Sequence, residues 1–230
     1  MDRYIKHTNF EFIGEQGQKK LLSSSVLIIG AGGLGSSFAN YFVRSGIGRV
    51  KIVDRDKVEL SNLQRQCIYD ETDIGKPKAL CALEKLKKVN SQIKIEAEVL
   101  EFGGANAEAL VKDFDLVIDA TDNFSSRFII DNVCTALKKP WIFTGILGAV
   151  AQTMLINYPQ TKRLSYIVPT NTRLHEIEPN INSSVLFPAV SAISGVASLL
   201  AVKYLTNQDY HPNTMFVFDF WNNTLKQIKF

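Results

Sequence analysis

The hydrophobic positions of this 230-residue chain form short, continuous runs that alternate with longer amphipathic segments. Runs such as SVLIIG, RVKIVD and DLVIDAT are typical of buried strands, and segments such as LGSSFANYFVRSG and KALCALEKLKKVN have the spacing of helices. Near the end, NTMFVFDF and TLKQIKF predict a hairpin that turns at Asn222 and Asn223. The pattern predicts an α/β fold with a doubly wound, mostly parallel sheet and a mixed, antiparallel carboxyl-terminal part.

Three polar stretches depart from this alternation. Residues 1–24 predict a helical lead-in to the first strand, residues 55–77 form an irregular stretch, and residues 159–187 predict a flexible loop. A long loop inside a compact domain is usually functional. We expect one domain over residues 1–230 and expect its irregular stretches to carry function.

Composition and charge narrow the class of protein. Hydrophobic residues make up 46% of the chain and charged residues 21%, as in ordinary soluble proteins, and the formal charge of +3 is spread over intermixed acidic and basic residues. We expect no nucleic-acid partner and no membrane span, because no segment offers about 20 uninterrupted apolar residues. The three cysteines are scattered, and no apolar leader precedes the first strand, which predicts a reducing, cytoplasmic location.

The segment GAGGLG follows the first predicted strand directly and opens a predicted helix. Its glycines Gly30, Gly32 and Gly35 fit the G-x-G-x-x-G pattern of Rossmann-like folds, in which a phosphate lies at a helix N-terminus. Asp54 ends the second predicted strand, where a carboxylate can accept hydrogen bonds from ribose hydroxyls. Together these residues indicate that the ligand is an adenosine nucleotide. At this point a nicotinamide dinucleotide is still allowed as that ligand.

The irregular stretch after Asp54 carries cations that suggest a triphosphate. Arg65 can bind phosphate oxygens in two places at once, and Lys78, near the start of a predicted helix, can follow charge that develops during nucleotidyl transfer. Asn62 and Gln66 can add neutral donors. The alternative is that the cations are ordinary solvated surface charges. Their position beside the glycine turn favours the phosphate role.

The segment TDN, residues 121–123, ends a buried strand, where open α/β sheets place their ligands. Asp122 is a candidate magnesium ligand, because magnesium prefers one or two protein carboxylates together with phosphate and water oxygens. A purely structural alternative is that Asp122 caps the helix that starts at Phe124. Both roles can coexist if Asn123 is the cap.

These residues and their spacing resemble those of the MoeB/ThiF/HesA family, the bacterial relatives of ubiquitin-activating enzymes. The resemblance covers nearly the whole chain, through RY near the start, GEQGQKKLLSSSVLIIGAGGLGS, VELSNLQRQ, DIGKPKA and TDNFSSR. It implies a homodimeric adenylyltransferase that uses ATP and magnesium. Its implied substrate is the C-terminal Gly-Gly carboxylate of a small ubiquitin-fold sulfur-carrier protein of thiamine or molybdopterin biosynthesis, and pyrophosphate is released.

The resemblance also implies a role for each matching position. The implied nucleotide turn consists of Gly30, Gly32, Gly33 and Gly35. The implied side-chain contacts are Asp54 to the ribose, Asn62, Arg65 and Lys78 to phosphate, and Asp122 to magnesium. We place Gln66 and Asn123 beside them as further nucleotide contacts.

The chain departs from the family pattern at several places. Lys6 stands where many members carry an arginine that reaches the ATP site of the partner subunit, so we expect a weaker contact in trans. No Cys-x-x-Cys pair is present, so no structural zinc is expected. The crossover loop, within residues 159–187, has no cysteine, which favours adenylation without a covalent thioester. Cys67 is expected to be a partly buried structural thiol.

Three functions compete at this stage. Adenylation of a ubiquitin-fold carrier is favoured, with another peptide or small-molecule carboxylate as a variant of it. A nicotinamide oxidoreductase explains the glycine turn alone and leaves Arg65, Lys78 and Asp122 without a role. A noncatalytic nucleotide-binding scaffold fits the missing zinc and crossover cysteines, but it has no need of phosphate-binding cations. The sequence does not identify which carrier protein is adenylated or which protein donates the sulfur.

Overall fold

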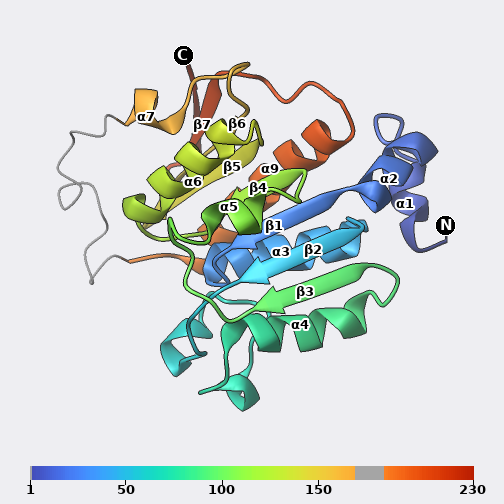
Figure 1. The fold of residues 1–230 in the computed structure, drawn as a ribbon, viewed down its shortest axis with the longest axis vertical. Helices are drawn as coiled ribbons and strands as arrows, with labels where there is room; N and C mark the ends of the chain where they lie inside the picture. The colour runs from blue at the N-terminus through green and yellow to red at the C-terminus, as the bar shows by residue number, and fades with distance from the viewer. Residues whose placement is uncertain (1, 169–183) are drawn as a thin grey trace.

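The computed structural model describes residues 2–168 and 184–230, and its strands form one eight-stranded sheet in the order β3-β2-β1-β4-β5-β6-β7-β8 (Figure 1). The pairs among β3, β2, β1, β4 and β5 are parallel, and those among β5, β6, β7 and β8 are antiparallel. This confirms the predicted fold class. The strands are β1 (Ser25–Ile29), β2 (Arg49–Val53), β3 (Lys94–Glu98), β4 (Leu116–Asp119), β5 (Trp141–Leu147), β6 (Val150–Ile156), β7 (Thr214–Asp219) and β8 (Thr224–Lys229).

Helices cover both faces of the sheet. The α-helices are α1 (Ile5–Thr8), α2 (Gly14–Ser23), α3 (Gly33–Ser45), α4 (Lys78–Val89), α5 (Ala107–Val111), α6 (Phe124–Ala136), α7 (Leu164–Ile167) and α9 (Phe187–Leu205). Short 3-10 helices are η1 (Asp2–Tyr4), η2 (Leu60–Asn62) and η3 (Glu71–Asp73). The helices η1, α1 and α2 precede β1, which confirms the helical lead-in predicted over residues 1–24.

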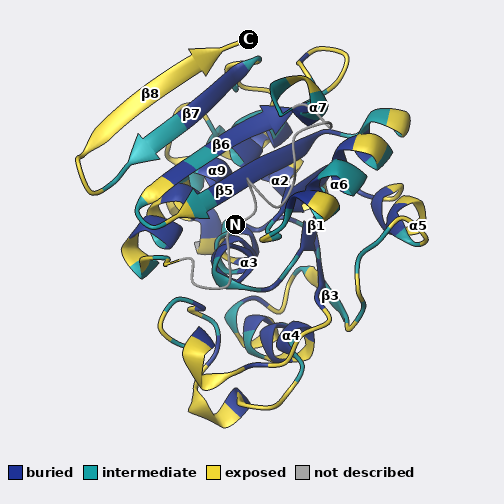
Figure 2. Ribbon diagram, turned by 90° about the vertical axis from the view of Figure 1, so that its left-hand side faces the viewer, coloured by how far each residue is buried: buried dark blue, intermediate teal, exposed yellow. Residues whose placement is uncertain are grey.

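Each face of the sheet has its own hydrophobic core. On one face, α3, α4 and α9 bury Phe38, Leu86 and Ile193 against the sheet, and on the other α5, α6 and α7 bury residues such as Ile130 and Leu164 (Figure 2). By length and composition alone α9 is apolar enough to cross a membrane, and half of that stretch is buried inside the protein. Because α9 packs on α3, β5 and β6, it is a core helix here.

The parallel register brings four strand ends to one edge of the sheet. Ile29, at the end of β1, pairs with Val53 of β2 and Asp119 of β4, and Val53 pairs with Glu98 of β3. The residues that follow these four positions therefore start their loops side by side. In a doubly wound sheet this edge, at the point where strand order reverses, is where ligands bind.

The predicted loop over residues 159–187 is only partly irregular. Its described part contains α7, whose backbone N–H groups at Leu164 and Ser165 donate to the buried Asp131 carboxylate of α6 at 3.1 and 3.4 Å. The sequence prediction missed this helix because four residues are too few to show a period. Residues 169–183, the rest of the predicted flexible loop, lie outside the described residues.

Candidate functional site

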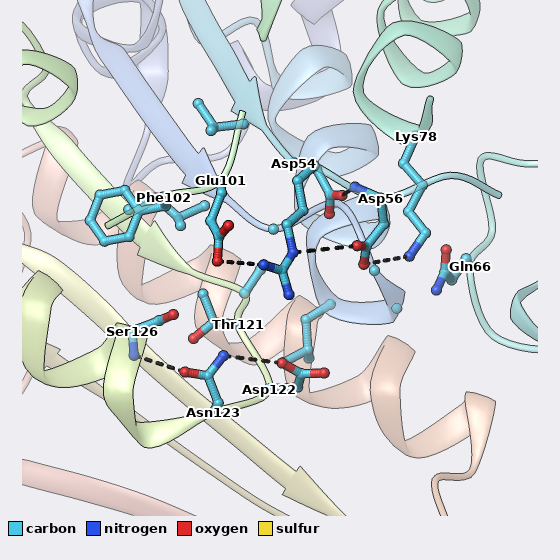
Figure 3. A pocket seen from close by; sticks show the side chains of 18 of the residues that line it. Asp54, Asp56, Gln66, Lys78, Glu101, Phe102, Thr121, Asp122, Asn123 and Ser126 are labelled. Atoms are coloured by element: carbon cyan, nitrogen blue, oxygen red, sulfur yellow. Dashed lines mark hydrogen bonds and ion pairs between the residues drawn. The ribbon is translucent and has the colours of Figure 1, made fainter. Parts of the chain in front are cut away.

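A cavity of about 1110 Å³ opens at the carboxyl ends of β1 to β4 (Figure 3). Figure 3 shows Asp56, Lys78 and Gln66 on one side of it and Thr121, Asp122 and Asn123 on the other. All but two of the residues predicted for the site line this cavity: Gly30, Gly32, Gly33, Asp54, Asn62, Arg65, Gln66, Lys78, Asp122 and Asn123. The two that do not are Gly35 and Lys6.

Two glycines of the turn, Gly30 and Gly35, pack too closely against the backbone to accept side chains. Gly30 has a φ of +97°, and a Cβ on it would lie 2.6 Å from the Ala120 carbonyl oxygen. A Cβ on Gly35 would lie 2.0 Å from the Gly30 oxygen, so Gly35 lets α3 approach the turn instead of facing the cavity. Gly32 is the N-cap of α3 and Gly33 its first residue. The free N–H groups of this helix start therefore face the cavity, as phosphate binding requires.

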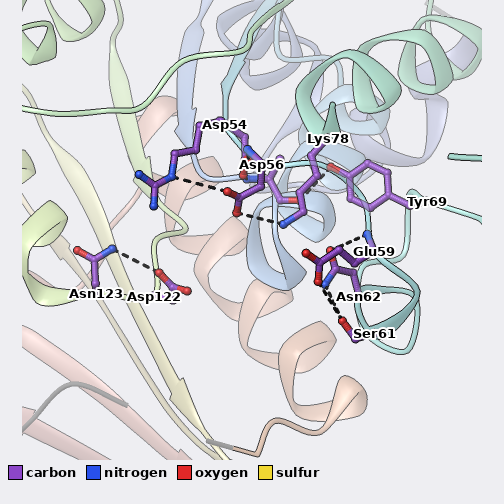
Figure 4. Close-up of polar contacts among 11 residues, drawn as sticks. Asp54, Asp56, Glu59, Ser61, Asn62, Tyr69, Lys78, Asp122 and Asn123 are labelled. Carbon is purple, nitrogen blue, oxygen red and sulfur yellow. Dashed lines mark hydrogen bonds and ion pairs between the residues drawn. The ribbon is translucent and has the colours of Figure 1, made fainter. Parts of the chain in front are cut away.

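Asp54 ties the glycine turn to the end of β2 (Figure 4). Its Oδ2 accepts the Ala31 N–H at 2.6 Å and its Oδ1 accepts the Asp56 N–H at 2.7 Å. Burial raises the pKa of Asp54 above the ordinary aspartate value, while these two hydrogen bonds and the nearby Lys78 act in the opposite direction. Each oxygen keeps acceptor capacity for a further donor, such as a ribose hydroxyl.

Lys78 begins α4 and is almost fully buried, with 7% of its surface exposed. Its ammonium lies 3.3 Å from Asp56 Oδ2, and its backbone N–H donates to the Asp56 carbonyl at 2.9 Å. Sequence reasoning did not single out Asp56, although its position two residues after Asp54 was a usable signal. Asp56 neutralises the charge of Lys78 on this wall of the cavity.

Gln66, Asn62 and Arg65 belong to the turn that follows β2. Gln66 is only 2% exposed, and its Oε1 has no hydrogen-bond partner among the described residues. Buried polar atoms are normally paired, so this amide is a fit for a ligand's polar group, whichever way its two ends are turned. Asn62 Oδ1 accepts the Glu59 N–H at 3.2 Å, and the Arg65 guanidinium donates to the Ser61 carbonyl at 3.1 Å.

The TDN segment forms the opposite wall. Asn123 is the N-cap of α6: its Oδ1 accepts the Ser126 N–H at 2.8 Å, and its Nδ2 donates to Asp122 Oδ1 at 3.3 Å. The interpretation of Asp122 as the cap is therefore wrong, and Asn123 as the cap is confirmed. The Asp122 carboxylate is exposed in the cavity, whereas the side-chain oxygen of Asn123 caps the helix.

The sequence of nearly the whole chain, residues 4–230, matches the model of one protein family, described as the ThiF family. The chain belongs to the ThiF family. Over 99% of its length it is 34% identical to a sulfur carrier protein ThiS adenylyltransferase of Bacillus subtilis, and it covers 67% of that protein. It is 38% identical, over 69% of its length, to a sulfur carrier protein adenylyltransferase of Thermus thermophilus, and covers 59% of it. This ThiF-family chain spans about two fifths to two thirds of the length of curated relatives that it matches.

Solved structures agree with the ThiF-family fold. The crystal structure of E. coli MccB with MccA-N7isoASN superposes with a TM-score of 0.87 over 99% of this chain and 72% of that one, at 22% identity. A structure of PaaA superposes with a TM-score of 0.83 over the same shares, at 23% identity. At this identity the likeness shows the shared fold, which agrees with the sheet order described above.

Charged residues that sequence reasoning missed also line the cavity. Arg55 forms an ion pair with Glu101, which follows β3, and its Nε lies 3.7 Å from Asp56. The hydrogen bond that the Arg55 guanidinium donates to the Glu101 carboxylate raises the pKa of Arg55 above its ordinary value. Arg127 of α6 also lines the cavity. The only sequence signal for Arg55 and Glu101 was their position just beyond strands that end at the functional edge.

The remaining predictions concern residues outside the cavity. Lys6 is exposed on α1, and its contact in trans stays a prediction. Among the described residues, no group of three histidine, cysteine or acidic side chains is arranged to hold a metal ion. Cys67 is exposed, so its predicted partial burial is wrong.

Proposed function

We propose that this protein is an ATP- and magnesium-dependent adenylyltransferase that activates the C-terminal glycine carboxylate of a small ubiquitin-fold sulfur-carrier protein. One observation carries the proposal: in a ThiF-family chain, a helix N-terminus, a ribose-type aspartate, phosphate-type cations and an exposed aspartate meet in one cavity. The curated relatives named above as sulfur carrier adenylyltransferases support the carrier as substrate class.

The cavity fits ATP in its donor set. The N-terminus of α3 offers backbone N–H groups to phosphate, and Arg65 and Lys78 offer cationic donors from the adjoining turn and helix. The Gln66 amide, whose Oε1 has no partner among the described residues, can bind a polar group of the nucleotide, and Asp54 can accept from the ribose. A nicotinamide oxidoreductase would leave Lys78 and Asp122 without a role.

The proposed step needs alignment and charge neutralisation more than proton transfer. A carboxylate oxygen of the carrier's last glycine bonds to the α-phosphorus of ATP, the bond from that phosphorus to the oxygen bridging to the β-phosphate breaks, and pyrophosphate leaves with the electron pair. The carboxylate is already ionised at neutral pH, so no histidine is required. Arg65 and Lys78 stabilise the charge that builds up on the phosphate oxygens.

Asp122 is the residue that would hold magnesium. When bound, the metal would neutralise phosphate charge. Asp122 is free for this role because Asn123 takes over the capping of α6. We further propose that the protein works as a cytoplasmic homodimer in which Lys6 approaches the site of the partner subunit.

ATP–pyrophosphate exchange tests the proposal. The protein is assayed with magnesium and with thiamine-type and molybdopterin-type carriers in turn, each ending in Gly-Gly. Asp122→Ala is the blank, and Asp113→Ala, an exposed aspartate outside the cavity, is the matched control. We expect exchange with one carrier, lost in Asp122→Ala and retained in Asp113→Ala. ATP binding without exchange with any carrier contradicts the carrier as substrate and directs the search to other carboxylates.

A further inference from the structure

A buried ion pair lies directly behind the TDN segment, and the proposed function so far gives it no role. Arg127, in the first turn of α6, donates from Nε to Asp119 Oδ2 at 3.0 Å, and the two side chains are 7% and 0% exposed. Burying two charges removes hydration that their attraction only partly replaces, so such a pair is weak grounds for stability. Its place beside the cavity suggests that it holds neighbouring groups of the cavity wall in position.

The remaining donors and acceptors of this pair hold the backbone of the neighbouring loop. Arg127 Nη2 donates to the carbonyl oxygens of Thr121 at 2.9 Å and Thr144, on β5, at 3.2 Å. Asp119 Oδ1 accepts from the Thr121 N–H at 2.9 Å and from its hydroxyl at 2.6 Å. Thr121 is therefore held from both of its backbone polar groups and from its side chain.

These bonds fix the direction of the peptide that joins Thr121 to Asp122. Because the Thr121 carbonyl oxygen points to Arg127, a trans peptide directs the Asp122 N–H to the opposite side. Among the described residues that N–H has no hydrogen-bond partner. The Asp122 side chain follows this peptide directly, and Asp122 lines the cavity. The guanidinium is fixed in turn by the rings of Phe124 and Phe143, at 4.9 and 5.2 Å.

We propose that Arg127 is a positioning residue: with Asp119 it holds the Thr121–Asp122 peptide so that the Asp122 carboxylate faces the metal of bound MgATP. This inference rests on the proposed function. It adds the Arg127–Asp119 pair to the residues on which magnesium binding depends. Lysine in place of Arg127 keeps the charge but loses the planar fork that reaches Asp119 and two carbonyls together.

The test compares two arginines that bind buried aspartates near the same helix. Arg127→Lys is the test variant. Arg163→Lys is its matched control, because Arg163 pairs at 3.1 Å with Asp131 of α6, also 0% exposed, and lies outside the cavity. Equilibrium ATP binding is measured over a range of magnesium concentrations, with kcat and KM for exchange and a thermal unfolding curve for each variant.

Without magnesium, we expect Arg127→Lys to bind ATP as the wild type does. The variant needs about tenfold more magnesium to reach the tighter ATP binding that magnesium gives, an effect typical of residues that orient metal ligands. Its kcat for exchange falls by about the same factor, while KM for the carrier is unchanged. Arg163→Lys keeps the wild-type magnesium dependence and kcat, even where its unfolding temperature falls.

A folded Arg127→Lys with wild-type magnesium dependence overturns the inference, and so does an equal shift in Arg163→Lys. If Arg127→Lys does not fold, Thr121→Val removes one bond to Asp119 without leaving a charge unpaired, and it must shift the magnesium dependence in the same direction. Wild-type protein that binds no ATP overturns the proposed function together with this inference, whereas an unshifted variant overturns the inference alone.

Discussion

The two halves of the sheet use their strand ends differently. In the parallel half, β1 to β4 all end at one edge, and the loops and helix starts beyond them carry every cavity residue from Gly30 to Asn123 that the sequence predicted. In the antiparallel half, β7 and β8 end at opposite edges, and β8 is exposed along its whole length (Figure 2). Parallel strands therefore gather distant segments into one site, which antiparallel neighbours do not.

The halves also differ in what they bury. The parallel half places buried polar side chains at its functional edge, among them Asp54, Gln66, Lys78 and Asp119. Burial of such groups is costly unless they are paired, and a protein that keeps them near a cavity has a ligand or a positional role for them.

The largest expected effect comes from removing a cation in each half. Lys78→Ala lowers the rate of carrier-dependent exchange by about 100-fold or more, because a buried cation aimed at the phosphates is lost. Lys226→Ala, on exposed β8, stays within about twofold of the wild type. Exchange kinetics of the two variants check this, and equal losses would show that the cavity is not where the chemistry happens.

A smaller effect is expected from adding a methyl group at two glycines. Gly35→Ala destabilises the fold by about 2 kcal/mol, because its Cβ would lie 2.0 Å from the Gly30 oxygen. Gly195→Ala, on α9 with nothing within 4 Å of its Cβ, stabilises by about 0.5–1 kcal/mol through helix propensity. Urea unfolding measures both. A neutral Gly35→Ala would contradict the close packing of α3 on the glycine turn.

The smallest effect is a difference in pH dependence between two aspartates at strand ends. Burial raises the folded pKa of Asp54, so its contribution to stability is fully present below the unfolded value of about 3.9 and is lost as pH rises through the raised pKa. Hydrogen bonds from Asn222 lower the pKa of Asp219, so its contribution is present above that value and is lost as pH falls through the lowered pKa.

The two aspartates therefore respond to acid in opposite directions. As pH falls through the raised pKa of Asp54, ATP affinity weakens because the ribose acceptor is protonated, and Asp54→Asn removes this part of the pH profile. Asp219→Asn leaves the ATP profile unchanged and removes a part of stability that disappears only below about pH 3.9. Binding and unfolding titrations measure both, and an Asp54→Asn profile identical to that of the wild type would contradict the ribose assignment.

Local patterns predicted most of the fold and much of the cavity. The periodicity of the strands and helices and the glycine turn after β1 depend on residues close in sequence, so the sequence was sufficient for them; it left the N-cap of α6 open between Asp122 and Asn123. The pairing of Lys78 with Asp56, the ion pair of Arg55 with Glu101 and the bond from Arg127 to Thr144 depend on which loops meet in space. Periodicity has no information on such side-chain partners, and so these residues were missed.

The exposure of Cys67 was mispredicted for a related reason. Free cysteines are usually buried, which suggested partial burial, but Cys67 lies in a turn where successive residues face different directions, and of its two neighbours only Gln66 is buried. In α7, the helix depends on the Asp131 carboxylate, more than thirty positions away in the chain, and not on its own four residues.

Carrier adenylation is measured most directly by the intact mass of the carrier after incubation with this protein, ATP and magnesium, with Asp113→Ala and Asp122→Ala proteins in parallel. We expect a carrier heavier by one AMP less one water, formed by the wild type and by Asp113→Ala and absent with Asp122→Ala. An unmodified carrier from wild-type protein that binds MgATP, tested across both carrier types, would contradict it.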